Sequence, residues 1–331
     1  MHHFVAVSRS YTRGASVSKL TRDKVMQAAQ TLGYQPNAIA RSLITRRSRM
    51  IGVVMSQLDN QFYPLVLEKL SQKLQADGYH VLLFINDKRN ADSVLQEILQ
   101  YQVDGIVLAS IALSSALAQQ CAKAGIPVVL FNRMTQHTEG KPLTYSSVTS
   151  DNFGGGAIVA EHFLAHGLKR MAYVAGLEDS STSLAREQGF CSTLAQAGLH
   201  LHSRAVGGYT YEGAQQAARS LFANPSARPD AVFVASDHMA FAVMDVLRTE
   251  MKIAVPDQVS VVGFDDVPHA AWGAYQLTTV SQAVEPMIEA TLQLLRERMN
   301  ENSTRGDPLT TPRTITLPCT LVSRKTVRAV H

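Results

Sequence analysis

From Met50 onward, short runs of β-branched and other apolar residues alternate with helical patterns of about 10 to 15 residues. Parallel strands need crossovers of about this length, so the alternation predicts right-handed βαβ units and parallel sheets. The expected strands are Met50–Ser56, His80–Ile85, Gly105–Ala109, Val128–Phe131, Arg170–Ala175, Ala231–Ala235 and Val259–Phe264. The expected helices include Tyr63–Ala76, Phe153–Ala165, Ser183–Ala197, Gly213–Phe222, Met239–Glu250 and Pro286–Met299. The number of strands fits an α/β fold with two doubly wound sheets.

Two further strand-like stretches, Ser146–Asp151 and Leu277–Gln282, are not preceded by a helix. We interpret them as crossovers between two lobes. The expected first lobe comprises 50–149 plus 281–311, and the expected second lobe comprises 150–280 plus 312–325. A cleft between such lobes collects the carboxyl ends of strands and the amino ends of helices, where open α/β sheets bind ligands.

The basic residues are concentrated at the start of the chain. Residues 1–50 contain nine Lys or Arg and a single acidic residue, Asp23, which gives this segment a charge of +8. The whole chain has 31 basic and 27 acidic residues, so residues 51–331 carry a charge of −4. A short basic segment ahead of a nearly neutral remainder favours a module that binds a polyanion, although a solvated basic arm would have the same composition.

Several classes of protein are disfavoured by what the sequence lacks. It has no run of about 18 apolar residues, and its first ten residues do not resemble a signal peptide, so we expect a cytoplasmic protein without a membrane partner. The three cysteines are far apart and without metal-ligand spacing, which predicts reduced thiols. They are Cys121, Cys191 and Cys319. No cofactor and no metal are expected.

The basic segment contains the signals of short helices. Val5–Tyr11 is compatible with a helix, and Ser18 precedes a helical pattern over Lys19–Leu32 that ends at Gly33, with Pro36 beyond it. Two short helices and a Pro-led basic segment cannot bury a core of their own.

The run VSRSYTRGASVSKLTRDKVMQAAQTLGYQPNAIARSLITRRSRMIGVV resembles the recognition helix, third helix, hinge helix and first sensor strand of lactose-repressor-type (LacI family) transcriptional regulators. The resemblance implies a small all-α N-terminal DNA-binding headpiece at 1–34 and a hinge at 35–49. It also implies a sensor of the type I periplasmic-binding-protein fold. The implied function is that of a repressor, a homodimer bound to a double-stranded DNA operator and controlled by a small molecule such as a sugar or sugar acid. An enzyme is not implied.

The resemblance assigns DNA-binding roles to residues in two groups. In the recognition helix these are Phe4, Val5, Val7, Ser8 and Arg9, and in the hinge helix they are Asn37, Ala38, Arg41 and Leu43. An arginine in the major groove can reach guanine O6 and N7, whereas a leucine at the hinge can wedge into the minor groove. The family has another helix and a turn before the recognition helix, so we expect an N-terminally truncated helix-turn-helix. A sensor without effective specific DNA binding is therefore the alternative.

The resemblance also implies effector-binding residues at the ends of strands and helices. They are Asn60, Phe62, Tyr63, Arg186, Tyr209, Ser236, Asp237, Asp265 and Gln282. A sugar offers apolar ring faces to aromatic side chains and hydroxyls to polar groups, and this set contains both. Asp265 is expected to accept sugar hydroxyls and Arg186 to grip hydroxyls or carboxylates, whereas Asp237 could simply cap a helix.

Other chemistries are suggested by isolated patterns. The contiguous Ser236, Asp237 and His238 invite a hydrolase interpretation, but no G-x-S-x-G elbow accompanies them. His162 and His166 have the i, i+4 spacing of metal ligands without an evident third ligand. The run NFGGG after Asp151 suggests a phosphate loop but matches no phosphate-binding motif, and a capped turn would explain it. A transport binding protein would share the sensor fold but needs an export signal.

Overall fold

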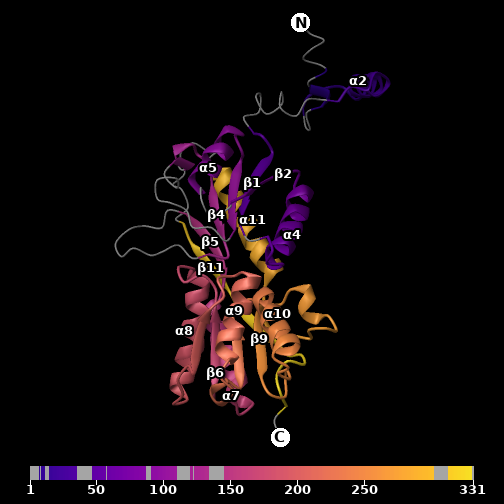
Figure 1. The fold of residues 1–331 in the computed structure, drawn as a ribbon. Helices are drawn as coiled ribbons and strands as arrows, with labels where there is room; N and C mark the ends of the chain where they lie inside the picture. The colour runs from indigo at the N-terminus through magenta and orange to yellow at the C-terminus, as the bar shows by residue number, and fades with distance from the viewer. Residues whose placement is uncertain are drawn as a thin grey trace. The chain divides into compact units, whose positions relative to one another are not determined.

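The structure is a computed structural model of the 331-residue chain. It describes residues 7, 9–11, 15–35, 47–56, 58–86, 91–109, 120–121, 123–133, 145–301 and 312–329. The chain divides into two compact units, Met1–Arg49 and Met50–His331 (Figure 1). We call the first unit the headpiece and the second the sensor.

In the headpiece, the helix α2 (Lys19–Leu32) forms where its sequence signals predict. The side chain of Ser18 accepts a hydrogen bond from the backbone N–H of Thr21, and Gly33 adopts the left-handed conformation that ends a helix (φ 61°). Val7 and Arg9 are helical and exposed, and the rings of Tyr11 and Tyr34 pack with centroids 6.1 Å apart. No side chain of α2 is buried among the described residues, which agrees with the expectation that these helices form no core of their own.

The sensor contains two sheets, as the alternating pattern predicts, and each sheet has six strands. The first sheet has the order β11-β5-β4-β3-β1-β2 and the second has the order β12-β10-β9-β8-β6-β7. The strands of the first are β1 (Met50–Met55), β2 (His80–Ile85), β3 (Gly105–Ala109), β4 (Val128–Phe131), β5 (Ser146–Ser150) and β11 (Thr314–Leu317). Those of the second are β6 (Met171–Ala175), β7 (Ser203–Val206), β8 (Ala231–Val234), β9 (Ser260–Asp265), β10 (Thr278–Gln282) and β12 (Cys319–Val322).

Helices pack on each sheet and complete two lobes (Figure 1). The first lobe has α4 (Phe62–Ala76), α5 (Ala91–Gln100) and α11 (Val284–Glu301). The second has α7 (Asn152–Ala165), α8 (Ser181–Gln196), α9 (Tyr211–Phe222) and α10 (Asp237–Asp245), the last continued by a π-helical turn over Val246–Glu250. Central strands such as β3, β6 and β8 are buried along their whole length, because helices cover both faces of a parallel sheet.

All strand pairs are parallel except β10 with β12, which makes β12 an antiparallel edge strand. The described chain passes between the lobes after β5, after β10 and between β11 and β12. Two boundaries therefore need correction. Ser281 and Gln282 belong to the second sheet rather than to the first lobe, and Thr314–Leu317 belongs to the first sheet rather than to the second lobe. The four-residue β7 was also missed, since SRAV carries almost no hydrophobic signal.

The NFGGG run begins α7 and brings it into close contact with α8. A Cβ on Gly156 would lie 2.0 Å from the carbonyl oxygen of Arg186, and a Cβ on Gly189 would lie 1.9 Å from that of Phe153. Asp151 caps the helix by accepting a hydrogen bond from the N–H of Gly154 at 2.8 Å. The glycines therefore serve helix packing, and a phosphate loop is not needed to explain them.

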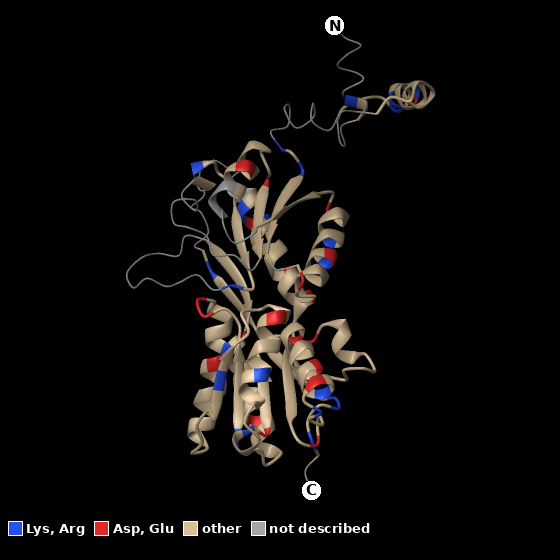
Figure 2. Ribbon diagram, viewed as in Figure 1, with Lys and Arg blue, Asp and Glu red and all other residues tan. Residues whose placement is uncertain are grey.

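Charged residues of the sensor lie mainly on helices and loops (Figure 2). Within the described ranges, no helix combines the length and apolar character needed to cross a membrane. The three cysteines are free thiols; Cys121 and Cys319 are buried and Cys191 is half-buried.

Candidate ligand-binding site

A pocket lies where the carboxyl ends of strands from both lobes meet, the position expected for a ligand of two α/β lobes. Its cavity volume is about 10 Å³, and about 260 Å³ is free of atoms when space open to solvent is counted. Six of the nine predicted effector residues line it: Asn60, Phe62, Tyr63, Arg186, Tyr209 and Asp265. Three residues that the sequence analysis did not name complete the lining: Asn132, Arg133 and Thr182. The site therefore combines carboxylate, guanidinium, amide and aromatic groups.

Asp265 ends β9 with a φ of 124°, a conformation that L side chains rarely adopt and that turns the chain out of the sheet. The residue is 4% exposed, and its Oδ1 accepts a hydrogen bond from Gln282 Nε2 at 2.6 Å. No donor among the described residues reaches the buried Oδ2 in hydrogen-bonding geometry. A buried acceptor of this kind is costly unless something donates to it, so Oδ2 is the atom best suited to a ligand hydroxyl.

Burial raises the pKa of Asp265 above its ordinary value, and Arg186, Gln282 and Asn60 each counteract that rise. The guanidinium of Arg186 faces this carboxylate, with Nη1 3.9 Å from Asp265 Oδ1. These partners offset part of the cost of burying the carboxylate, and the pKa stays raised, to about 6.

Arg186 is only 2% exposed, and neighbouring groups hold its guanidinium on several sides. Its Nε donates to Asn152 Oδ1 at 2.8 Å, its Nη1 donates to the Ala235 carbonyl at 2.5 Å, and its guanidinium lies 3.6 Å above the ring of Phe264. These contacts do not use Nη2. The arginine thus has a structural role in the second lobe as well as a place in the pocket wall.

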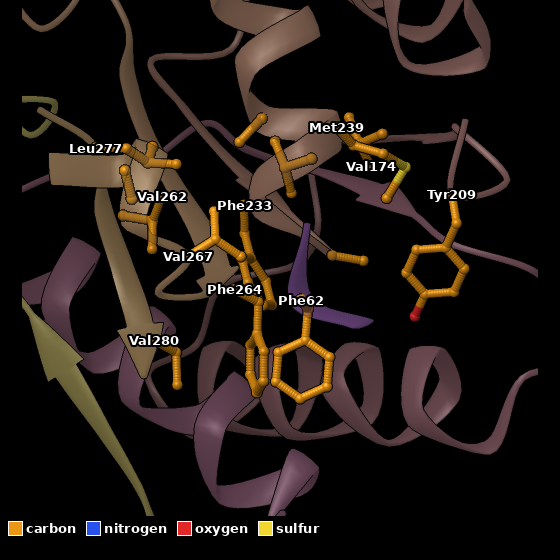
Figure 3. Close-up of a cluster of buried hydrophobic side chains, with 14 of the residues drawn as sticks. Phe62, Val174, Tyr209, Phe233, Met239, Val262, Phe264, Val267, Leu277 and Val280 are labelled. Atoms are coloured by element: carbon orange, nitrogen blue, oxygen red, sulfur yellow. The ribbon is translucent and has the colours of Figure 1, made fainter. Parts of the chain in front are cut away.

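Aromatic side chains form another part of the wall. Tyr209 is held in a left-handed conformation (φ 59°), and its ring occupies the space above Gly176, where a Cβ would lie 2.2 Å from the ring. Figure 3 shows Tyr209, Phe62 and Phe264 in one buried cluster, to which α4 of the first lobe contributes Phe62 and β9 of the second contributes Phe264. Phe62 is both a core residue and a pocket residue.

Arg133 and Gln61 connect the two lobes at the pocket rim. Arg133, just after β4, donates from Nη1 to Ser180 Oγ and lies 3.5 Å from Thr182 Oγ1. Gln61 Nε2 lies 3.4 Å from His238 Nδ1. Sequence reasoning missed Arg133, but a signal was present, because Asn132 and Arg133 directly follow the buried strand VVLF.

The remaining predicted effector residues lie behind the pocket. Ser236 caps α10 through the N–H of Met239, at 3.4 Å. Asp237 is fully buried and accepts hydrogen bonds from the N–H of Val267 at 2.9 Å and from Thr279 Oγ1 at 2.5 Å. Gln282 contacts Asp265 and not the pocket itself. These three residues support the site from the second sheet and are not in its lining.

The alternative chemistries find no geometry to support them. Ser236, Asp237 and His238 contact four different partners, Met239, Val267, Thr279 and Gln61, and are not hydrogen-bonded to one another. His162 and His166 stack with centroids 4.3 Å apart, but among the described residues no group of three or more potential ligands could hold a metal ion.

The DNA-binding predictions fall mostly outside the described residues. Val7 and Arg9 are described and exposed, as a groove-facing role requires. The others lie outside the described part of the chain: Phe4, Val5, Ser8, Asn37, Ala38, Arg41 and Leu43. Their roles stay predictions.

Comparison with known proteins places this architecture among transcription regulators. Residues 160–327 match a family model of the periplasmic binding protein-like domain. The chain is 32% identical over 306 residues to the HTH-type transcriptional regulator CelR of Thermobifida fusca, which covers 90% of this chain and 88% of that protein.

Solved structures agree. A complex of the transcriptional regulator CelR with cellobiose has a TM-score of 0.73 at 29% identity and covers 96% of this chain and 94% of that one. The lac repressor dimer bound to operator and the anti-inducer ONPF has a TM-score of 0.84 at 24% identity, covering 98% and 96%, and shows the shared fold. From its fold, its cleft and a relative above 30% identity along most of its length, the chain belongs to the LacI family of transcriptional regulators.

Proposed function

We propose that this protein is a transcriptional repressor whose affinity for a DNA operator is controlled by a sugar or sugar acid bound between the sensor lobes. The proposal includes an N-terminal headpiece that contacts DNA through the residues named above and a sensor that is not an enzyme. Because its proposed partner is operator DNA, the protein would act in the cytoplasm.

The single observation that carries the ligand part is the buried Asp265 Oδ2, an acceptor turned out of the sheet beside the fixed guanidinium of Arg186. A carboxylate and a guanidinium fork can bind vicinal hydroxyls or a hydroxyl and a carboxylate, while Tyr209 and Phe62 offer faces to the ring. The solved complex of CelR with cellobiose is consistent with a carbohydrate in the corresponding cleft.

The ligand is tested by thermal shift against cellobiose, D-glucose, D-ribose, D-glucuronate and adenine. We expect at least one carbohydrate to raise the Tm, by an amount that grows with its concentration. Asp265→Asn should abolish the rise for that sugar, since an amide cannot replace the carboxylate at both oxygens. A sugar-induced shift that survives Asp265→Asn unchanged would move the site elsewhere.

DNA binding is tested by selection from random duplexes, followed by gel shifts of the selected duplex and of a scrambled one at two salt concentrations. The sugar that raises the Tm should release the protein from the selected duplex. Phosphate contacts from the basic headpiece predict a steep loss of affinity with salt on both duplexes, whereas base contacts predict a preference for one. Sugar binding without any preferred duplex would favour the alternative of a sensor that does not bind DNA specifically.

A homodimer is part of the proposal. Leu83 and Ile85 are 37% and 58% exposed on β2, the outermost strand of the first sheet, and Trp272 is 55% exposed in the second lobe. An exposed apolar edge suits association with a second copy, and two-fold symmetry suits a palindromic operator. We expect sedimentation of a dimer at micromolar concentration and of a monomer for Ile85→Lys. Leu184→Lys, at a 42% exposed position on α8, is the matched control.

A further inference from the structure

The three connections between the lobes meet near the pocket. Ser150 is the last residue of β5 and precedes α7, so it marks the first connection. Gln282 is the last residue of β10 and precedes α11, so it marks the second. Gln282 also pairs with Cys319, the first residue of β12, which follows the third. Closure of two lobes around a ligand changes the backbone at such connecting residues.

A chain of buried hydrogen bonds joins these connections to the pocket. Ser150 Oγ donates to Gln282 Oε1 at 2.7 Å, and Gln282 Nε2 donates to Asp265 Oδ1 at 2.6 Å. The three residues are 2%, 4% and 4% exposed. Ser150 Oγ also lies 3.2 Å from Met287 Sδ on α11, so the first connection contacts the helix that follows the second.

We propose that Gln282 and Ser150 form a relay that couples the Asp265 carboxylate to the connections between the lobes. The amide can play this part because its two ends are different. An ionised carboxylate only accepts, so Nε2 must face Asp265 and Oε1 must face Ser150, whose hydroxyl then has to donate. A ligand that donates to Asp265 Oδ2 competes for the same carboxylate charge and so changes the strength of the hydrogen bond from Gln282 Nε2. This in turn changes the hydrogen bond between Gln282 and Ser150, which joins the first two connections.

Gln282 and Ser150 are therefore positioning residues, which act through Asp265 and do not contact ligand. The inference deepens the proposed function and rests on it, because Asp265 is the ligand contact. The relay is nevertheless tested on the full chain without added sugar. A failure of the relay therefore does not imply a failure of the proposed function, nor the reverse.

The test compares two buried serines of the same strand. Ser150→Ala removes a bond between the lobes, whereas Ser147→Ala removes the 2.8 Å contact with Thr314 Oγ1, which stays within the first sheet. Hydrogen–deuterium exchange reports cleft opening at the N–H groups of Phe62 and Gly176, which are hydrogen-bonded to the side chains of Asn60 and Ser183. Amides of β1 and β9 report global unfolding.

We expect the Phe62 and Gly176 amides to exchange about fivefold faster in Ser150→Ala, as the loss of one hydrogen bond implies, and at the wild-type rate in Ser147→Ala. Equal rates in both variants, or no acceleration in Ser150→Ala, would overturn the proposal. In an Asp265→Ala background, Ser150→Ala should accelerate exchange less than about twofold, because Gln282 is already released. A full fivefold effect there would show that the Ser150 bond acts without Asp265 and would overturn the relay.

Discussion

Arg186 provides the sharpest test of how the site is built, because its contacts belong to the fold as much as to the pocket. Arg186→Ala removes a guanidinium from a 2% exposed position and leaves Asn152 Oδ1 and the Ala235 carbonyl without that donor. Each unpaired buried acceptor costs about 1–3 kcal/mol, and breaking a buried ion pair typically costs about 3–5 kcal/mol in total. We therefore expect the free energy of unfolding to fall by about 4 kcal/mol.

The assay is thermal and urea unfolding of the full chain, with Arg204→Ala as the control. Arg204 also pairs with carboxylates, those of Glu187 and Glu178, but its side chain is 33% exposed, so its removal should cost about 1 kcal/mol or less. At roughly 2–4 °C per kcal/mol, the Tm should fall by about 10 °C for Arg186→Ala and by a few degrees at most for Arg204→Ala.

The pH dependence of the loss is a second signature. Arg186 lowers the pKa of Asp265, so its removal lets burial raise that pKa further. When the pKa of a carboxyl is raised in the folded state, the free energy of unfolding falls as pH rises from the ordinary pKa to the raised one. Below the ordinary pKa this cost is absent. The difference between wild type and Arg186→Ala should therefore be larger at pH 8 than at pH 5. Equal losses for the two arginine variants, or a difference independent of pH, would refute the reasoning.

Three further outcomes are expected. Gly176→Ala places a Cβ 2.2 Å from the Tyr209 ring and should weaken binding of the sugar that raises the Tm at least tenfold, as measured by calorimetry. Gly273→Ala, whose Cβ meets no atom within 4 Å, should leave the binding unchanged. Gly156→Ala meets the Arg186 carbonyl at 2.0 Å and should lower the free energy of unfolding by about 3 kcal/mol, measured in urea. Burial lowers the pKa of His238, so the unfolded chain takes up a proton first and stability should rise with pH up to about 6.5; His238→Gln should reduce that slope in Tm measurements, and an unchanged slope would contradict the assignment.

The parts of the fold that sequence reasoning predicted are those in which burial dictates residue type. Strands such as GIVLA and AVFV read as continuous apolar runs because helices cover both sides of them. The edge strand SRAV and the strand TITL carry no such run, so the first was missed and the second was placed in the wrong lobe.

For the site, the resemblance to the family identified six of the lining residues, yet it could not separate lining from support. Asp237 and Asp265 both follow buried strands, and only the three-dimensional contacts show that Asp237 is fully used by Val267 and Thr279. Burial, and next the nearby carboxylate of Asp265, raise the pKa of Asp237. Its hydrogen bond from the N–H of Val267 holds the turn that follows Asp265. Arg133 was missed because its contact partner, Ser180, lies 47 residues away and in the other lobe.

The interleaving of the lobes has a consequence for how the sensor can be divided. The first sheet needs β11, and the second needs β12, although both come after residue 312. A chain cut after Gln282 would therefore lack α11 and β11 from one lobe and β12 from the other, so no single break releases an intact half. Neither lobe is a unit that a gene could gain, lose or exchange as one continuous piece, and a nonsense codon late in the reading frame damages both at once.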